Sequence, residues 1–226
     1  MLLSIIPKNI ALESIEAAIL FAYIVGILYV TKILYNIMIR RGLPHNVAVY
    51  YNRKFIHVFA GGVVALLTPI LFTSPLIPLI LAFILAVFCY IPHRRGKLLY
   101  WFQVEDNMYE VNFCIMWGIT IFVLWLLFGN PWLAIVPVAF MAFGDAATGV
   151  VRNTLFKRRT KHWVGNIAMF ATCAPLGLYY AGIPGLIAAA VASLIERFEF
   201  NPIDDNVLIC ISATVVLYIL YMLLHL

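Results

Sequence analysis

The chain has 226 residues, of which 65% are hydrophobic and only 11% are charged, and its formal net charge is +5. Soluble globular domains are about half apolar and a quarter charged, so this composition excludes an ordinary soluble domain. A soluble chain of this composition could not cover its surface with polar groups. We therefore expect a membrane protein surrounded by membrane lipids, with no nucleic-acid partner.

Apolar stretches divide the chain into about eight candidate transmembrane segments, since a helix needs about 20 apolar residues to cross a bilayer. The predicted segments are 15–37, 55–73, 75–92, 110–128, 131–151, 163–182, 184–196 and 206–226. The seventh is short and is predicted to be tilted, half-inserted or partly re-entrant. We expect an all-α polytopic transmembrane helix bundle that forms one integral membrane domain over residues 1–226.

Basic residues follow every second segment. They gather after the first, third, fifth and seventh segments, and thirteen of the fifteen Lys and Arg fall on this side, with Lys8 and Lys32 as the exceptions. Loops rich in Lys and Arg face the cytoplasm. The pattern therefore predicts a multi-pass protein with both termini outside. The membrane would be the plasma membrane in a prokaryote and the endoplasmic reticulum or a plastid membrane in a eukaryote.

The second segment opens with "RKFIHVFAGG", in which Arg53, Lys54 and His57 are spaced to share overlapping helix faces. Free amide groups at a helix N-terminus favour an anion, and cations placed there oppose the helix dipole. These cations therefore suit a bound phosphate. The alternative is that Arg53 and Lys54 only orient the protein or contact lipid headgroups.

The fifth segment contains "AFGDAATG", which places Asp145 among apolar residues about two helical turns from the basic loop. A carboxylate inside hydrocarbon costs several kcal/mol and usually marks function. Pairing with a neighbouring helix for packing is the alternative. Gly144 and Gly149 allow another helix or a ligand to approach the backbone closely. The loop that follows carries Lys157, Arg158 and Lys161.

The stretch "IERFEFNPIDDN" contains four of the ten acidic residues of the chain, including Glu196, Asp204 and Asp205. One aspartate is enough to cap the last helix. The remaining carboxylates, beside a basic loop, are typical ligands for a hard cation such as Mg²⁺. A helix cap in a solvated loop is the alternative for the whole cluster.

Phosphate-binding cations, a buried carboxylate and a candidate metal site are thus predicted on one cytoplasmic surface. This combination suits phosphoryl transfer, which depends mainly on positioning and charge neutralisation. The chain has neither a GxxxxGK[ST] motif nor a kinase glycine loop. A nucleotide would therefore be held in another way.

Four motifs in order resemble the polyprenol kinase family, which includes dolichol kinase, phytol kinase and the CTP-dependent diacylglycerol kinase, with CDP-diacylglycerol and CDP-archaeol synthases as distant relatives. They are "RKFIH", "GD" before a basic loop, "KHWVGN", and a glutamate nine positions before "DN", and they cover about residues 50 to 210. The resemblance implies a CTP-dependent, metal-dependent kinase that phosphorylates a lipid alcohol such as a polyprenol, phytol or diacylglycerol.

The resemblance also implies residue roles. The residues that match its motifs are Arg53, Lys54, His57, Gly144, Asp145, Lys161, Gly165, Glu196, Asp205 and Asn206. From these we expect catalysis by Asp145, Lys161 and His57, and metal binding by Glu196 and Asp205 with Asp145. The nucleotide or its phosphates would contact Arg53, Lys54, Gly144, Lys157, Arg158, Gly165, Asn166 and Asn206. His162 and Asn166 stand where the family usually has Ser or Thr. This departure puts a role of those hydroxyls at phosphate in doubt.

Two other functions remain open from the sequence. A cytidylyltransferase would also use CTP and a metal but would join CMP to a lipid phosphate and release pyrophosphate. A small transporter would also explain an intramembrane aspartate and histidine. The order of the motifs and the lack of inverted repeats favour the kinase.

Overall fold

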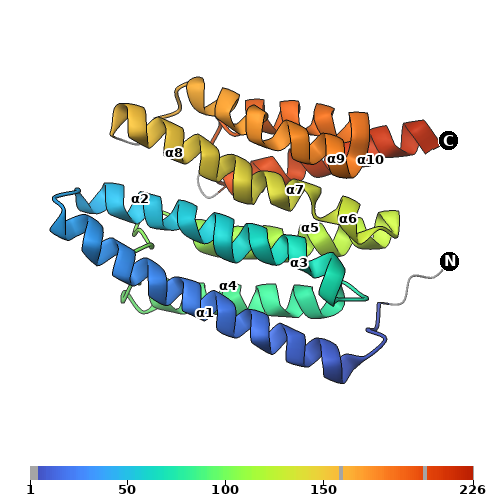
Figure 1. The fold of residues 1–226 in the computed structure, drawn as a ribbon, viewed down its shortest axis with the longest axis horizontal. Helices are drawn as coiled ribbons and strands as arrows, with labels where there is room; N and C mark the ends of the chain where they lie inside the picture. Colours follow the sequence, from blue (N-terminus) through green and yellow to red (C-terminus); the bar gives the residue numbers. More distant parts are fainter. Residues whose placement is uncertain (1–4, 158–159, 201–202, 226) are drawn as a thin grey trace.

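The computed structural model describes residues 5–157, 160–200 and 203–225, and within these ranges the chain is all-α. The elements are α1 (Ile10–Arg40), α2 (His45–Ile56), η1 (His57–Gly62), α3 (Val63–Leu71), α4 (Leu76–Arg94), α5 (Tyr109–Phe128), α6 (Pro131–Ala134), α7 (Val136–Ala139), η2 (Phe140–Gly144), α8 (Asp145–Phe156), α9 (Val164–Ile195) and α10 (Asp205–His225). They form one elongated bundle whose helices run along its long axis (Figure 1).

Seven helices in the described residues are long and apolar enough to cross a membrane. Two of them are composite. Elements α2, η1 and α3 form the span His45–Leu71, and elements α6, α7, η2 and α8 form the span Pro131–Phe156. The protein is therefore a multi-pass helical membrane protein.

The predicted count of eight differs from these seven helices because the predicted segments 163–182 and 184–196 both fall within α9. Within α9, Gly182 has a non-helical backbone, with φ 60° and ψ −143°. A Cβ placed on Gly177 would lie 2.4 Å from the carbonyl oxygen of Gly185. In a straight helix these two residues would be about 12 Å apart, so the chain folds back on itself at Gly182.

This reversal makes α9 a hairpin of two antiparallel arms, and the chain runs back along the bundle there. Both described ends of the chain consequently lie at the same end of the bundle (Figure 1). The opposite end holds the segments 41–44, 95–108, 160–163 and 197–200, and we call it the basic end. The predicted alternation of the basic loops thus matches the arrangement of the helices in space.

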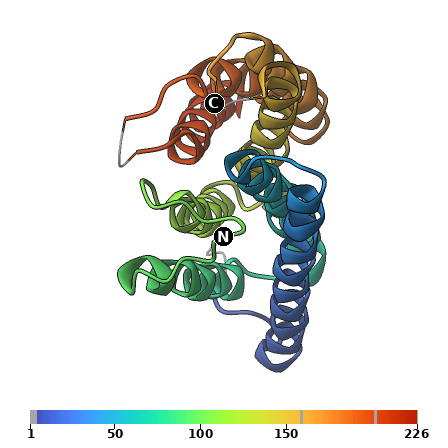
Figure 2. The ribbon, with the colours of Figure 1, turned by 90° about the vertical axis from the view of Figure 1, so that its left-hand side faces the viewer.

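The bundle packs around α5, which lies between α4 and the group formed by α8, α9 and α10 when viewed from the basic end (Figure 2). Its buried core includes Ile121, Leu124, Phe140, Met141 and Met169. On the outer surface, apolar side chains such as Tyr29, Ile70, Tyr179 and Leu223 are exposed, as expected for contact with lipid. The structure therefore has an apolar core and an apolar surface, with polar groups concentrated inside the basic end.

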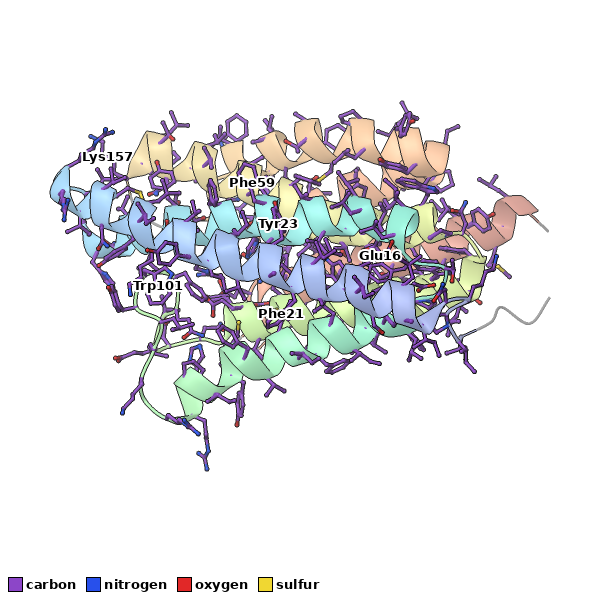
Figure 3. The ribbon with its side chains drawn as sticks, turned by 60° about the horizontal axis from the view of Figure 1, so that its bottom comes forward. Glu16, Phe21, Tyr23, Phe59, Trp101 and Lys157 are labelled. Carbon is purple, nitrogen blue, oxygen red and sulfur yellow. The ribbon has the colours of Figure 1, made fainter. Side chains whose placement is uncertain are left out.

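Helix α1 is attached to the second span near the middle of the bundle. The hydroxyl of Tyr23 donates a hydrogen bond of 3.0 Å to the carbonyl oxygen of Phe59, and the two residues lie close together in Figure 3. Phe59 belongs to the π-helical element η1, in which the regular hydrogen-bond ladder changes and a carbonyl is available to Tyr23. This contact fixes α1 beside the segment that carries the "RKFIH" motif.

Candidate functional site

A buried ion pair joins the "RKFIH" and "GD" motifs, whose paired residues are 91 positions apart in the sequence. The Nζ of Lys54, from α2, lies 2.7 Å from Oδ1 and 2.6 Å from Oδ2 of Asp145, at the start of α8. The Nδ1 of His57 lies 3.0 Å from the same Oδ2. Asp145 is 2% exposed, so its charge is balanced inside the bundle and not by solvent. The pairing that was predicted as an alternative for Asp145 is therefore present, and it involves two motif residues.

Both motifs sit at π-helical turns. His57 begins η1, and η2 ends at Gly144, immediately before Asp145. A π-turn widens the helix and redirects the side chains beside it, and such turns are frequent at functional sites. No periodicity in the sequence marks them, which is why the sequence predicted two uninterrupted helices here.

The second group of charges lies where the loop before α9 meets the start of α10. The Nζ of Lys161 lies 2.8 Å from Oδ2 of Asp205 and 3.1 Å from Oε1 of Glu196, and it also donates to the backbone oxygen of Glu196 at 2.9 Å. Burial opposes the charge on Lys161, but Asp205 and Glu196 outweigh it and raise the pKa of Lys161 above its ordinary value. Lys161 is therefore a permanent cation between two carboxylates.

Arg152 organises this group from α8, although the sequence placed it only among the topology signals. Its Nη1 lies 2.7 Å from Oε1 of Glu196, its Nε donates to the backbone oxygen of His162 at 2.8 Å, and its Nη2 donates to Oδ1 of Asn166 at 3.1 Å. Arg152 is 2% exposed. Three acceptors, one for each nitrogen, use the donors of the guanidinium fork. The only sequence signal for this role is its spacing: Arg152 is seven residues, or about two helical turns, after Asp145 and therefore on the same face of the helix.

Three carboxylates from different helices converge on a candidate metal site. Ligand atoms of Asp145, Glu196 and Asp205 all lie within 4.8 Å of one another. Magnesium binds oxygen at about 2.1 Å, so two oxygens on one ion are at most about 4.2 Å apart. A contraction of a few tenths of an ångström would bring these groups into range. Three hard oxygen donors fit Mg²⁺, and they are the three residues that the sequence predicted as ligands.

Asp204 has a different task from its neighbour. Its Oδ1 accepts a hydrogen bond of 3.1 Å from the backbone nitrogen of Val207, so it caps the start of α10. Its Oδ2 accepts from Nδ2 of Asn112 and from Nδ2 of Asn206, both at 3.2 Å. Burial, with the charge of Asp205, raises the pKa of Asp204 to about 6. One aspartate therefore caps the helix, and Asp205 is left for the charged cluster.

Arg53 faces a separate group on α5 that the sequence did not single out. Its guanidinium lies 3.9 Å from the centre of the Tyr109 ring, and its Nε is 3.5 Å from Oε1 of Glu110. Oε2 of Glu110 lies 3.8 Å from Nε2 of His93. The sequence analysis did not single out Glu110, because nothing in the sequence shows that the start of α5 packs beside Arg53.

Two cavities meet the charged groups at Arg53. The polar cavity, of about 190 Å³, opens at the basic end and is lined by Tyr50, Arg53, Asp106, Tyr109 and Asn153, among others. A small pocket beside it is bordered by Tyr50, Arg53, Tyr109, Lys54, Arg152, Lys161, Glu196 and Asp205. We call this the phosphate pocket. Since it shares Tyr50, Arg53 and Tyr109 with the polar cavity, the two adjoin.

The inner cavity, of about 70 Å³, lies on the other side of Arg53. Arg53, His57 and Glu110 are its charged or polar lining, and the rest is almost entirely apolar. A fourth space, the outer groove, has about 430 Å³ and is lined mostly by apolar residues of α1, α2, η1 and α8, together with Arg41, Asn52 and Lys54. Polar and apolar spaces therefore both reach the lysine and arginine of the "RKFIH" motif.

Other predicted site residues serve mainly to bring these groups together. A Cβ on Gly144 would lie 2.3 Å from Sγ of Cys173, and a Cβ on Gly165 would lie 2.2 Å from Nε of Arg152. These glycines allow close packing of η2 on α9 and of Arg152 beside α9. Asn166 hydrogen-bonds the backbone oxygen of Ser193 through Nδ2 and so joins the two arms of the α9 hairpin. Asn206 contacts Asp204, as described above.

The structure does not bring Lys157 into the cluster. Lys157 ends α8 with φ 51° and is exposed at the basic end (Figure 3). Arg158, the other predicted phosphate contact in this loop, lies outside the described residues. The loop therefore contributes Lys161 to the buried site, and Lys157 faces the surroundings of the protein.

Comparisons with models of protein families, with curated proteins and with solved structures give no match. The resemblance to polyprenol kinases consequently rests on the four motifs alone. The arrangement of those motifs in space is an independent observation, because residues 54, 145, 161, 196 and 205 come from separate segments and form one connected group of charges.

Proposed function

We propose that this protein is a CTP-dependent kinase that phosphorylates the hydroxyl group of a membrane-embedded lipid alcohol at the cytoplasmic side. The observation that carries the proposal is the position of Asp145. Its carboxylate is buried among membrane helices, and its ligand atom lies within 4.8 Å of those of Glu196 and Asp205. A site that must serve both a lipid and a charged nucleotide needs this combination of depth and charge.

The nucleotide would approach from the basic end. Its triphosphate would lie in the phosphate pocket, where Arg53, Lys54 and Lys161 can neutralise the β and γ groups. The polar cavity next to it is then the space for the nucleoside. Asp145, Glu196 and Asp205 would hold Mg²⁺, which supplies charge neutralisation at the phosphates when bound.

The lysines would exchange partners when the nucleotide binds. Without it, Lys54 neutralises Asp145 and Lys161 neutralises Glu196 and Asp205. With a nucleotide and a metal ion present, the carboxylates gain a new cation and the lysines gain phosphate oxygens. Each buried charged group would then have a partner of opposite charge in both states, which matters because unpaired charges inside a membrane protein are costly.

The reaction follows from this placement. The hydroxyl oxygen of the alcohol attacks the γ-phosphorus of CTP, and the bond from that phosphorus to the oxygen bridging the β-phosphate breaks. CDP leaves with that oxygen, and the proton of the hydroxyl passes to the Asp145–His57 pair and from there to water. Phosphoryl transfer needs little covalent assistance from the protein, so positioning by Arg53, Lys54 and Lys161 would supply most of the rate enhancement.

The test is turnover by purified protein with CTP labelled at the γ-phosphate and a panel of lipid alcohols, analysed by thin-layer chromatography. We expect label in a lipid phosphate and release of CDP. Asp145→Asn should abolish the transfer while the protein remains folded. Release of pyrophosphate with a CDP-lipid product would replace the proposal by a cytidylyltransferase. No product with any alcohol or lipid phosphate would reject both enzymes.

A further inference from the structure

The inner cavity is an elongated slot and not a round pocket. His57 and Val64 both line it from the second span, and Glu110 and Trp117 both line it from α5. Each pair is separated by seven residues, which corresponds to about 10 Å along a helix. The slot therefore runs parallel to the helices, from Arg53, His57 and Glu110 at the basic end toward the middle of the bundle.

The walls of the slot are close-packed. Helices α1, α4 and α5 and the second span all contribute to its lining. On one side the Nε1 of Trp117 donates a hydrogen bond of 3.1 Å to the backbone oxygen of Gly61, and a Cβ on Gly61 would lie 2.4 Å from Cζ of Phe113. The helices are thus held at a fixed separation, which limits the slot to about 70 Å³.

His57 is the polar group between this slot and Asp145. Its Nδ1 faces Asp145 at 3.0 Å, and its ring packs on Phe113 with 4.3 Å between ring centres. Its Nε2 forms no hydrogen bond with a described residue. His57 is 4% exposed, and an imidazole nitrogen can donate or accept one hydrogen bond, so Nε2 can serve a ligand that carries one polar group.

We propose that the inner cavity binds the hydroxyl-bearing end of a single-chain lipid alcohol, with the hydroxyl hydrogen-bonded to Nε2 of His57 and the hydrocarbon chain in the slot. This inference rests on the proposed function. It narrows the acceptor to alcohols with one chain, such as an isoprenoid alcohol. Diacylglycerol is excluded because its second chain would have to enter the same narrow space between helices held by Trp117 and Gly61.

The outer groove is the competing location, and it differs in ways that the structure makes clear. It is about six times larger than the inner cavity, and the residues around it include Phe59 and Val150, which are 39% and 43% exposed. A membrane lipid of any kind can cover such a surface. Its polar lining includes Lys54, which is paired with Asp145, and Asn52, whose Nδ2 donates to the backbone oxygens of Thr31 and Trp101, together with Arg41 at the basic end.

A matched pair of substitutions separates the two locations. Ala60 lines the inner cavity and Val58 lines the outer groove, and both belong to η1. Ala60→Leu should raise the KM for geranylgeraniol by about tenfold or more while the KM for CTP stays unchanged. Val58→Phe should change neither constant. The reverse result, with loss in Val58→Phe only, would overturn the proposal.

Acceptor choice provides a second readout. The wild-type protein should use geranylgeraniol with a kcat/KM at least about tenfold above that for diacylglycerol. Leu85→Ala, which enlarges the slot, should raise the kcat/KM for diacylglycerol and so reduce the ratio between the two alcohols. Because this variant gains an activity, a general loss of folding cannot imitate the expected result. Equal use of both alcohols by the wild-type protein contradicts the proposal.

A binding measurement that needs no turnover keeps this inference distinct from the proposed function. A geranylgeraniol analogue carrying a diazirine should cross-link to peptides of α4 and α5, and unlabelled geranylgeraniol should compete. Cross-linking there without any kinase activity would reject the proposed function and retain the lipid site. Kinase activity with cross-links confined to α8 and the last two turns of α1, which line the outer groove, would reject the lipid site and retain the kinase.

Discussion

Lys54 and Asp145, 91 positions apart in the chain, form a bidentate ion pair inside the bundle, with Nζ 2.7 Å from Oδ1 and 2.6 Å from Oδ2. The pair links the second span to the fifth beside a π-helical turn in each, since η1 begins three residues after Lys54 and η2 ends immediately before Asp145. Removing one partner leaves a buried charge without compensation, whereas removing both does not.

We expect this asymmetry in stability measurements. Lys54→Met and Asp145→Leu should each lower the free energy of unfolding by about 3–5 kcal/mol, and the double variant should recover most of that loss. Thermal or denaturant unfolding in detergent, read by circular dichroism, gives the comparison. Additive losses in the double variant would show that the two residues do not depend on each other.

Asp204 and Asp205 are adjacent but have separate roles, so they make a matched pair of substitutions. Asp205→Asn should abolish kinase turnover or raise the Mg²⁺ concentration that it requires, because a carboxylate of the three-residue cluster is lost. Asp204→Asn should keep activity, since an amide oxygen can still cap α10 at Val207. Steady-state assays over a range of Mg²⁺ test both. Equal losses in the two variants would contradict the division of roles.

Arg152 should be intolerant even of lysine. A lysine can reach one acceptor at a time, whereas Arg152 bonds His162, Asn166 and Glu196 together. We expect Arg152→Lys to lose about 2–3 kcal/mol of stability and most of its activity, because hydrogen bonds to a charged group are among the stronger ones. Arg94→Lys, at an exposed position of the basic end, is the control and should behave like the wild-type protein. Normal behaviour of Arg152→Lys would mean that the fork geometry is unimportant.

The sidedness of the bundle is open to a direct test. If the basic end faces the cytoplasm, a cysteine introduced at Lys97 should react with a membrane-impermeant maleimide only after the cells are opened. A cysteine at Asn130, at the other end, should react in intact cells. The native cysteines are buried or partly buried, so a variant lacking them provides the background. Labelling of position 97 from outside would invert the topology and place the candidate site away from cytoplasmic CTP.

The sequence predicted the class of fold, the alternation of charges and the residues of the carboxylate cluster, because these follow from composition and from polar residues in apolar surroundings. Arg152 shows that the sequence alone does not predict which basic residues are buried. Arg53 and Lys54 were predicted as phosphate contacts, but Arg152 was counted only with the cations that orient the protein, and the structure buries all three. Whether a basic residue near a membrane boundary points outward or inward depends on which helix packs beside it, and that is a property of tertiary structure.

The partners of Arg53 illustrate the same limit. Glu110 and Tyr109 lie at the start of α5, more than 50 positions away, and only the packing of α5 against the second span brings them to Arg53. The boundary between the predicted sixth and seventh segments was closer to the observed geometry. That boundary was placed at residue 183, and the chain reverses at Gly182.

The reversal at Gly182 provides the last prediction. Its φ of 60° and ψ of −143° suit glycine and strain any residue with a side chain, although a Cβ there would meet nothing within 4 Å. Gly182→Ala should therefore lose about 1–3 kcal/mol of stability through backbone strain alone. Gly26→Ala is the matched control, since Gly26 lies inside α1 and its Cβ would also meet nothing. That variant should gain about 0.5–1 kcal/mol because alanine favours the helix.

The two variants should thus change stability in opposite directions in the same unfolding assay. The Gly182 variant should also lose activity, since Lys161 reaches Glu196 only when the two arms of α9 lie side by side. Opposite shifts would confirm the strained reversal, and a neutral or stabilising Gly182→Ala would show that α9 does not turn back at this residue.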